Sequence, residues 1–84
     1  MFYKVQDVKP LSEYKLLVVF RNGERKIYDV KPLFELWEPF RSLASDDGLF
    51  EKVRVDMGGY GIVWNDDIDL HCNELYAGGT SVQA

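Results

Sequence analysis

The sequence contains little cysteine, little histidine and a deficit of positive charge. Its 84 residues include one cysteine, Cys72, and one histidine, His71. A single thiol excludes an internal disulfide and suits a reducing compartment, so we expect a cytoplasmic protein. Ten basic residues stand against fourteen acidic ones, giving a net charge of -4. This balance disfavours a nucleic-acid binder that works by neutralising phosphates.

Long apolar runs are also absent, and this argues against a membrane protein. The first ten residues, MFYKVQDVKP, lack the apolar stretch of a signal peptide or a membrane span. Apolar residues make up 46% of the chain and charged residues 29%, which is typical of one small globular domain. We expect that domain over residues 1–76. The sequence AGGTSVQA over residues 77–84 predicts a helix stop and a flexible tail.

Alternating apolar residues predict a first strand over residues 2–8 and a hairpin formed by residues 14–20 and 24–30. A three-residue hairpin loop with Gly23 in the left-handed conformation pairs Leu16 with Tyr28. A two-residue loop would instead send Tyr28 to the opposite face. We prefer the three-residue loop, because it gathers more apolar side chains on one face, namely Leu16, Val18, Phe20 and Tyr28.

A second hairpin is predicted over residues 53–64. Gly58 and Gly59 suit a two-residue turn, and this turn sets the register of the two strands. Four apolar side chains then share one face: Val53, Val55, Ile62 and Trp64. Because this register agrees with both the turn and the burial pattern, we expect Trp64 in the core, against Val53 and the helix that carries Leu33 and Trp37.

Helical spacing is found between and after the hairpins. Pro32 suits a first helical turn and Pro39 interrupts it, so we expect a broken helix over residues 32–38 and 39–44. Asp46 is the expected N-cap of one further turn through Phe50. A short final helix is expected near residues 72–76, with Gly78 just past its end.

These elements predict an α+β domain with a mainly antiparallel sheet, in the order βββ–broken helix–ββ–short helix. One face of the sheet should be covered by apolar side chains of the helices, namely Leu33, Leu36, Trp37, Phe40, Leu75 and Tyr76. The strand over residues 14–20 is apolar on its other face as well, through Leu17 and Val19. A symmetric homodimer would cover that second face.

Short segments of the chain, taken in their order and spacing, resemble a known family. They are Leu16, Val18 and Phe20, then Asn22-Gly23-Glu24, Tyr28-Asp29-Val30, Pro32-Leu33, Phe40, Leu43, Phe50, Val53-Arg54-Val55-Asp56, Gly61-Ile62, Trp64, Asp69-Leu70 and Leu75-Tyr76. In this order and spacing, the chain resembles an uncharacterised bacterial family, domain of unknown function 2442, over about residues 3–76. Family members usually carry a Ser-Pro-like pair where this chain has His71-Cys72, which weakens the expected cap of the last helix.

The resemblance implies a cytosolic domain with no established activity. Some members look like neighbours of a second small protein, in an arrangement similar to toxin–antitoxin pairs. The resemblance therefore implies a protein partner, and it carries over no catalytic residue, metal or cofactor.

The residues themselves indicate no enzyme and no metal centre. His71 and Cys72 are neighbours on a helix and do not face each other, so they make no nucleophilic dyad. Joined to Asp66, Asp67 and Asp69, they still lack the further Cys or His ligands of a zinc site and the loop of an EF-hand. We interpret Asp66 and Asp67 as a solvated turn that binds local amides.

Two other patterns have structural interpretations. Asp29 and Asp69 each lie between a strand-like run and a helical one, and we interpret both as caps or turn-formers rather than as paired catalytic acids. The run Gly58-Gly59-Tyr60-Gly61 lacks the lysine and the helix of a phosphate loop, so it predicts a hairpin turn.

The charges are divided unevenly along the chain. Residues 1–42 hold eight basic and six acidic residues, a net of +2, and residues 43–84 hold two basic and eight acidic ones, a net of -6. The basic half leaves open a nucleic-acid surface made of Lys4, Arg21, Arg25 and Lys26 with Tyr3 and Tyr28.

The expected function is that of a non-enzymatic cytosolic protein-interaction domain. An acidic surface around Asp66, Asp67 and Asp69 would suit a small basic protein as the partner of an antitoxin-like domain. The alternative is a regulatory module that binds a small ligand or a nucleic acid. A pocket lined by convergent polar groups would favour that alternative.

Overall fold

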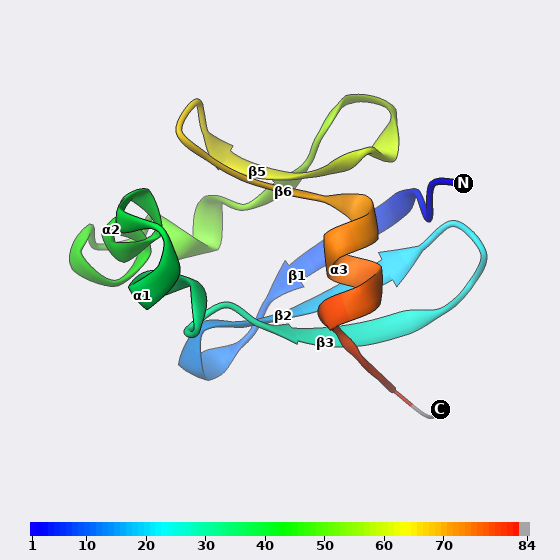
Figure 1. Ribbon diagram of the computed structural model, residues 1–84, viewed down its shortest axis with the longest axis horizontal. Helices are drawn as coiled ribbons and strands as arrows, with labels where there is room; N and C mark the ends of the chain where they lie inside the picture. Colours follow the sequence, from blue (N-terminus) through cyan, green and yellow to red (C-terminus); the bar gives the residue numbers. More distant parts are fainter. Residues whose placement is uncertain (83–84) are drawn as a thin grey trace.

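Two antiparallel sheets form the framework of the computed structural model, which describes residues 1–82 (Figure 1). The four-stranded sheet has the order β1-β2-β3-β7, and the three-stranded sheet has the order β4-β5-β6. Their bounds are β1 Val5–Pro10, β2 Lys15–Phe20, β3 Arg25–Asp29, β4 Arg54–Val55, β5 Gly61–Asn65, β6 Ile68–His71 and β7 Thr80–Ser81. The predicted α+β class and antiparallel pairing are confirmed. The strands β6 and β7 were not predicted, nor was the division into two sheets.

Short helical segments connect the sheets. The α-helices are α1 Leu33–Leu36, α2 Ser42–Ser45 and α3 Cys72–Gly78. Single 3-10 turns are η1 Ser12–Tyr14, η2 Glu38–Arg41, η3 Phe50–Lys52 and η4 Met57–Gly59. In Figure 1, α1 and α2 gather at one end of the molecule, whereas α3 lies between the two sheets.

The register predicted for the first hairpin is confirmed. Leu16 pairs with Tyr28, and Gly23 has a φ of 92°, in the left-handed region that a glycine tolerates. The Phe20 N–H donates to the Glu24 carbonyl oxygen at 2.8 Å, which closes the three-residue loop. The strand before this hairpin is Val5–Pro10 rather than residues 2–8. Pro10 is tolerated because it ends an edge strand.

The second hairpin also has its predicted register, since Val55 pairs with Ile62. Gly58 and Gly59 both have positive φ, and the Asp56 N–H donates to the Gly61 carbonyl oxygen at 2.9 Å. The chain then returns as β6, in which buried Ile68 and Leu70 alternate with exposed neighbours. This alternation is the period of a strand, but it is too short to stand out in the sequence.

Pro39 breaks the predicted helix into α1, η2 and α2. Asp46 does not cap the next turn with its side chain; it ends α2, where its N–H donates to the Ser42 carbonyl oxygen at 2.8 Å. The following turn is closed by the Leu49 N–H, which donates to the Asp46 carbonyl oxygen at 3.1 Å. Backbone hydrogen bonds therefore close this turn in place of the predicted Asp46 side-chain cap.

One core is shared by both sheets and the helices. Its buried apolar residues are Val5, Leu16, Val18, Phe20, Tyr28, Val30, Leu33, Phe40, Leu43, Leu49, Phe50, Ile62, Trp64, Ile68, Leu70, Cys72 and Leu75. The predicted burial of Leu36 and Trp37 is wrong, because these side chains are 67% and 50% exposed. The backbone of Trp37 is extended (φ -133°, ψ 117°) and ends α1 after one turn.

Trp64 is buried as predicted, with 3% of its surface exposed. Its indole Nε1–H donates to the Phe50 carbonyl oxygen at 3.0 Å, which satisfies the one polar group of a buried tryptophan. The ring lies 6.1 Å from Phe40 and 6.2 Å from Phe50, measured between centroids. Trp64 therefore packs against η2 and η3, and its aromatic neighbours are these two rings.

Regular structure extends past the boundary expected at residue 76. Ala77 and Gly78 belong to α3, so Gly78 lies inside the helix, and Gly79 is its C-cap. Thr80 then pairs with Ile27 and adds β7 to the edge of the first sheet. Two residues are too few to show a strand pattern in the sequence. The end of the expected tail, residues 83–84, lies outside the described residues.

Candidate functional site

The predicted acidic residues lie in two different settings. Asp66 and Asp67 form the exposed turn between β5 and β6. The side chain that binds an amide of this turn is that of Asn65 and not that of Asp66 or Asp67. Its Oδ1 accepts from the Asp67 N–H at 2.9 Å. Asp69 is neither a cap nor a turn-former, because it is an exposed residue of β6 opposite Val63. The two carboxylates of the turn are thus available on the surface.

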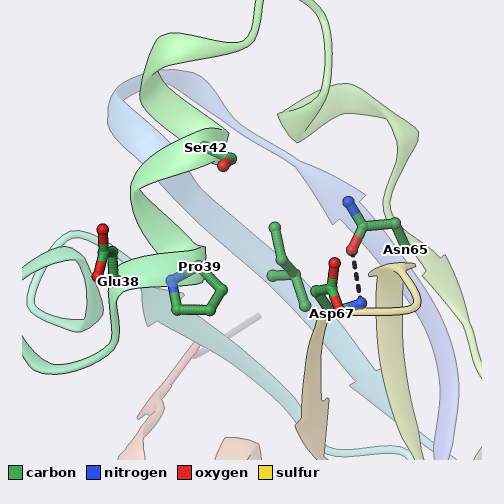
Figure 2. Close-up of a pocket in the computed structure, with 6 residues that line it drawn as sticks. Glu38, Pro39, Ser42, Asn65 and Asp67 are labelled. Carbon is green, nitrogen blue, oxygen red and sulfur yellow. Dashed lines mark hydrogen bonds between the residues drawn. The ribbon is translucent and has the colours of Figure 1, made fainter.

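Figure 2 shows an open pocket between η2 and the β5–β6 turn, which we call the cavity of this end of the molecule. Its volume is about 320 Å³, and its lining consists of Glu38, Pro39, Ser42, Asn65, Asp67 and Ile68. Asp67 lies on the β5–β6 side of this pocket, and Glu38 lies on the far side of Pro39 from Asp67 (Figure 2). No sequence pattern links Glu38 to the predicted acidic residues, because only the fold brings these segments together.

Two large apolar side chains are exposed directly before Glu38 on the chain. Leu36 and Trp37 are 67% and 50% exposed, although part of the Trp37 ring lies near Phe40 at 5.6 Å between centroids. We call Leu36, Trp37, Glu38, Asp66 and Asp67 the acidic end of the molecule. It combines a half-exposed aromatic ring with carboxylates on neighbouring segments.

The predicted nucleic-acid surface is not assembled as expected. Tyr28 is buried, and its hydroxyl donates to Glu74 Oε2 at 3.0 Å. Burial, followed by this hydrogen bond, raises the pKa of Tyr28 well above its ordinary value. Lys26 Nζ donates to the Tyr76 carbonyl oxygen and lies 3.8 Å from the centroid of the Tyr76 ring. Both residues fasten α3 to β3 rather than forming an open basic surface.

Tyr3 is also part of this internal contact. Its ring stacks on Tyr76 with 3.6 Å between centroids and an interplanar angle of 4°. A hydrogen bond with Glu24 raises the pKa of Tyr76 to about 12. The stacked pair links the N-terminal segment to α3, and this explains why tyrosines that look like a binding surface in the sequence have a structural role.

A different set of basic and aromatic residues gathers instead. Lys4 Nζ lies 4.8 Å from the centroid of the Tyr60 ring, and the Phe2 ring meets Tyr60 edge-on at 5.4 Å between centroids. Phe2, Lys4 and Arg21 line a pocket of about 380 Å³. Met57, in the loop before Tyr60, is 90% exposed. We call Phe2, Lys4, Arg21, Met57 and Tyr60 the basic end.

Gly59 explains how the β4–β5 loop reaches this position. Its φ is 79°, and a Cβ built on it would lie 2.7 Å from the Val5 carbonyl oxygen and 3.1 Å from the Arg21 guanidinium. Only a glycine permits so close an approach of the loop to β1 and to Arg21. The glycines that predicted a hairpin turn therefore also place Tyr60 beside Lys4.

His71 and Cys72 have structural roles in this geometry. His71 Nδ1 accepts from the Asn73 N–H at 3.1 Å and so caps the N-terminus of α3. The expectation of a weakened cap is wrong, because an imidazole nitrogen serves as the acceptor that a serine would supply. Cys72 is fully buried, and its Sγ lies 3.9 Å from the same nitrogen.

The remaining sequence candidates are the turn residue Asp29, a metal site and a membrane span. Asp29 Oδ1 accepts from the Lys31 N–H at 3.1 Å, as expected of a turn-former. Among residues 1–82, no group of three or more His, Cys, Asp or Glu is placed to hold a metal ion. Within the same range, no helix has the length and apolar character needed to cross a membrane.

The model of one protein family matches this chain over residues 5–81, and that family is described as a protein of unknown function, DUF2442. The chain belongs to this family. The match begins at the first residue of β1 and ends at the last residue of β7. Both sheets and the helices between them therefore belong to the unit that defines the DUF2442 family. No curated protein and no solved structure matches the chain.

Proposed function

We propose that this DUF2442 domain is a non-enzymatic interaction domain of the bacterial cytoplasm that binds a small basic protein through its acidic end, in the manner of an antitoxin-like partner. The observation that carries the proposal is the cavity shared by Glu38 and Asp67 next to the exposed Trp37. A partner that places a lysine or arginine there meets the carboxylate of Asp67, and a second basic residue can reach Glu38 on the other side of Pro39.

The apolar part of the acidic end supports a protein as the partner. Tryptophan is among the residues most enriched at the energetic centres of protein interfaces. Trp37 and Leu36 lie next to each other on the chain and both remain at least half exposed. Covering them would remove apolar surface from water at about 25 cal/mol per Å².

The charges of the same end support a basic partner. Asp66, Asp67 and Glu38 are all exposed, and no hydrogen bond within residues 1–82 ties these carboxylates to a basic side chain. Like charges gathered on a surface raise the association rate of a partner of opposite sign. The fold gains nothing from this clustering, so a role in association accounts for it better than a role in stability.

The roles of His71 and Cys72 support a function without catalysis. His71 Nδ1 is occupied by the Asn73 N–H, and the Cys72 thiol is fully buried. A nucleophile must be reachable and must have a base in hydrogen-bonding geometry. Cys72 is not reachable from solvent, and the His71 nitrogen that lies 3.9 Å from its sulfur already accepts from the Asn73 N–H.

A small cationic ligand is the second candidate for the same cavity. Its volume of about 320 Å³ lies at the lower end of ligand pockets. A ligand of this kind would bind Glu38 and Asp67 without needing Leu36. Replacing Leu36 by Ala therefore separates the two candidates, since only a protein partner would lose contact surface.

The proposal is tested with the partner captured from the native host on the immobilised chain. In the variant Glu38→Gln/Asp67→Asn, the association rate at about 50 mM salt should fall by about tenfold, and its dependence on salt should weaken. The matched control is Asp7→Asn/Glu51→Gln, which removes the same charge outside the cavity. An association rate that falls equally in both variants, or in neither, would overturn the proposal.

A further inference from the structure

The large exposed apolar side chains are concentrated at two places. Apart from Val82, they are Met1, Phe2, Met57 and Tyr60 at the basic end and Leu36 and Trp37 at the acidic end. In Figure 1, α1, α2 and the β5–β6 turn lie at one end of the longest axis. The N-terminus, the β2–β3 loop and the β4–β5 loop lie at the other end, and the molecule is 33 Å long.

The two ends carry opposite charges around these apolar groups. Lys4 and Arg21 line the pocket of the basic end, and none of the residues that line it in the described part of the chain is acidic. Glu38 and Asp67 line the cavity of the acidic end, and none of its lining residues is basic. The lining of each pocket thus carries charge of a single sign next to exposed apolar surface, although the exposed Asp56 precedes Met57 and the exposed Arg41 ends η2.

The basic end is better suited to a protein than to a single-stranded nucleic acid. Base stacking needs an open aromatic face, but the Tyr60 ring already has Lys4 Nζ over it and Phe2 against it. Tyr3 is likewise stacked on Tyr76. The exposed Met57 is an adaptable apolar group of the kind found at protein interfaces. A net charge of -4 further opposes a polyanionic ligand.

We infer that the basic end of one copy of this chain docks on the acidic end of a second copy. Lys4 and Arg21 of one copy then face Glu38 and Asp67 of the next, while Phe2 and Met57 meet Leu36 and Trp37. Because the two surfaces differ, the contact is head-to-tail and continues from copy to copy instead of closing as a symmetric pair. The inference rests on the acidic end of the proposed function, but not on the identity of its basic partner.

This association should be weak and sensitive to salt. Each end contributes only a few side chains, which places the contact at the small end of protein interfaces. Its ion pairs are at the surface and are screened at physiological ionic strength. A basic partner with a larger contact would therefore displace the neighbouring copy from the acidic end, so that self-association and partner binding exclude each other.

Two neutral variants test the arrangement. Lys4→Gln/Arg21→Gln disables only the basic end, and Glu38→Gln/Asp67→Asn disables only the acidic end. Sedimentation equilibrium at about 20 mM salt should show a wild-type mass that rises past the dimer as the concentration approaches millimolar values. Each variant alone should stay monomeric. An equimolar mixture of the two should reach twice the monomer mass and stop, because each copy keeps one working end.

The matched control is Lys9→Gln/Arg25→Gln, which removes two basic charges from exposed positions of β1 and β3. It should associate like the wild type. A monomeric wild type at every concentration, or an association that is lost in the control and kept in Lys4→Gln/Arg21→Gln, would overturn the inference. So would a monomeric wild type that binds a single-stranded RNA oligonucleotide through Lys4 and Arg21, which would assign the basic end to nucleic acid.

The outcomes also separate this inference from the proposed function. A wild type that stays monomeric but captures a basic partner through Glu38 and Asp67 leaves the proposed function intact and removes head-to-tail docking. A mixture that stops at the dimer supports head-to-tail docking. If the captured partner also binds independently of Glu38 and Asp67, the proposed function is removed.

Discussion

The acidic end and the basic end are built from different kinds of structure. The acidic end combines one-turn helical segments with the β5–β6 turn, whereas the basic end combines the N-terminal segment with two hairpin loops. Each draws on both halves of the sequence, since Glu38 joins Asp67 and Lys4 joins Tyr60. The fold therefore separates the charges by bringing distant segments together. The change in net charge along the sequence shows only part of this separation.

Substitution of Trp64 should cause the largest loss of stability, because this buried side chain packs against η2, which carries Glu38 of the acidic end. Its ring packs against Phe40 of η2 and Phe50 of η3, and its indole N–H bonds to the Phe50 carbonyl oxygen. Trp64→Ala should lower the free energy of unfolding by about 3–5 kcal/mol, which approaches the whole stability of a small domain. Urea denaturation measures this loss. A cooperatively folded Trp64→Ala variant with nearly wild-type stability would contradict the core assignment.

Trp37 provides the direct contrast with Trp64, because one tryptophan is half exposed and the other is buried. Trp37→Ala should change the free energy of unfolding by less than about 1 kcal/mol, as expected at an exposed position. The dissociation rate of the captured partner should nevertheless rise by about tenfold or more, as at an interface hot spot. Surface plasmon resonance measures the rate, and an unchanged value would remove Trp37 from the interface.

His71 supports the basic end through α3, because its ring lies 5.5 Å from the Phe2 ring and its Nδ1 caps the helix. His71→Ala should lower the free energy of unfolding by about 0.5–2 kcal/mol, which is the usual cost of losing an N-cap. His71→Asn keeps an acceptor at this position and is the matched control. Equal losses in the two variants would show that capping is not what His71 contributes.

Tyr28 is a buried residue of β3 that belongs to neither end, so it should affect stability without affecting either surface. Its raised pKa means that the folded state keeps the phenolic proton above pH 10, where the unfolded chain releases it. The stability that this proton contributes is complete below pH 10 and is lost progressively as the pH rises above it. Tyr28→Phe should cost about 0.5–1.5 kcal/mol at neutral pH through the lost hydrogen bond to Glu74.

The alkaline limb of the stability curve is the sharper test of Tyr28. In Tyr28→Phe, the fall in stability above pH 10 should be shallower than in the wild type. Thermal unfolding followed from pH 8 to pH 11 measures both curves, and parallel curves would contradict the role of this phenol. Tyr76, whose pKa is raised to about 12 by Glu24, continues to contribute in both proteins.

Local patterns predicted the hairpins well and the helical region less well. Gly23 and the Gly58-Gly59 pair fixed two registers, because a turn and an alternating strand constrain each other over a few residues. The exposure of Leu36 and Trp37 could not be predicted, since helical spacing is meaningful only while the helix lasts and α1 ends after one turn. The short β7 offered no pattern at all.

The candidate site was predicted only in part, because local patterns do not show which distant segments meet in the fold. Asp67 was identified, but its partner Glu38 lies on a distant segment, and only the tertiary fold shows that the two share a cavity. Asp69 looks equivalent to Asp66 and Asp67 in the sequence, yet it belongs to β6. The basic end was predicted only in part: Lys4 and Arg21 were named, but Lys26, Tyr3 and Tyr28 look as accessible in the sequence as Tyr60 does.

The measurement that tests the central claim most directly compares two pairs of acidic residues at equal net charge. Glu38→Gln/Asp67→Asn and Glu51→Gln/Asp69→Asn each remove two negative charges from exposed positions, but only the first pair lines the cavity of the acidic end. The association rate of the captured basic partner is measured for both variants at about 50 mM salt by stopped flow. We expect the first variant to associate severalfold more slowly than the second. Equal rates would show that net charge, and not the cavity of the acidic end, attracts the partner.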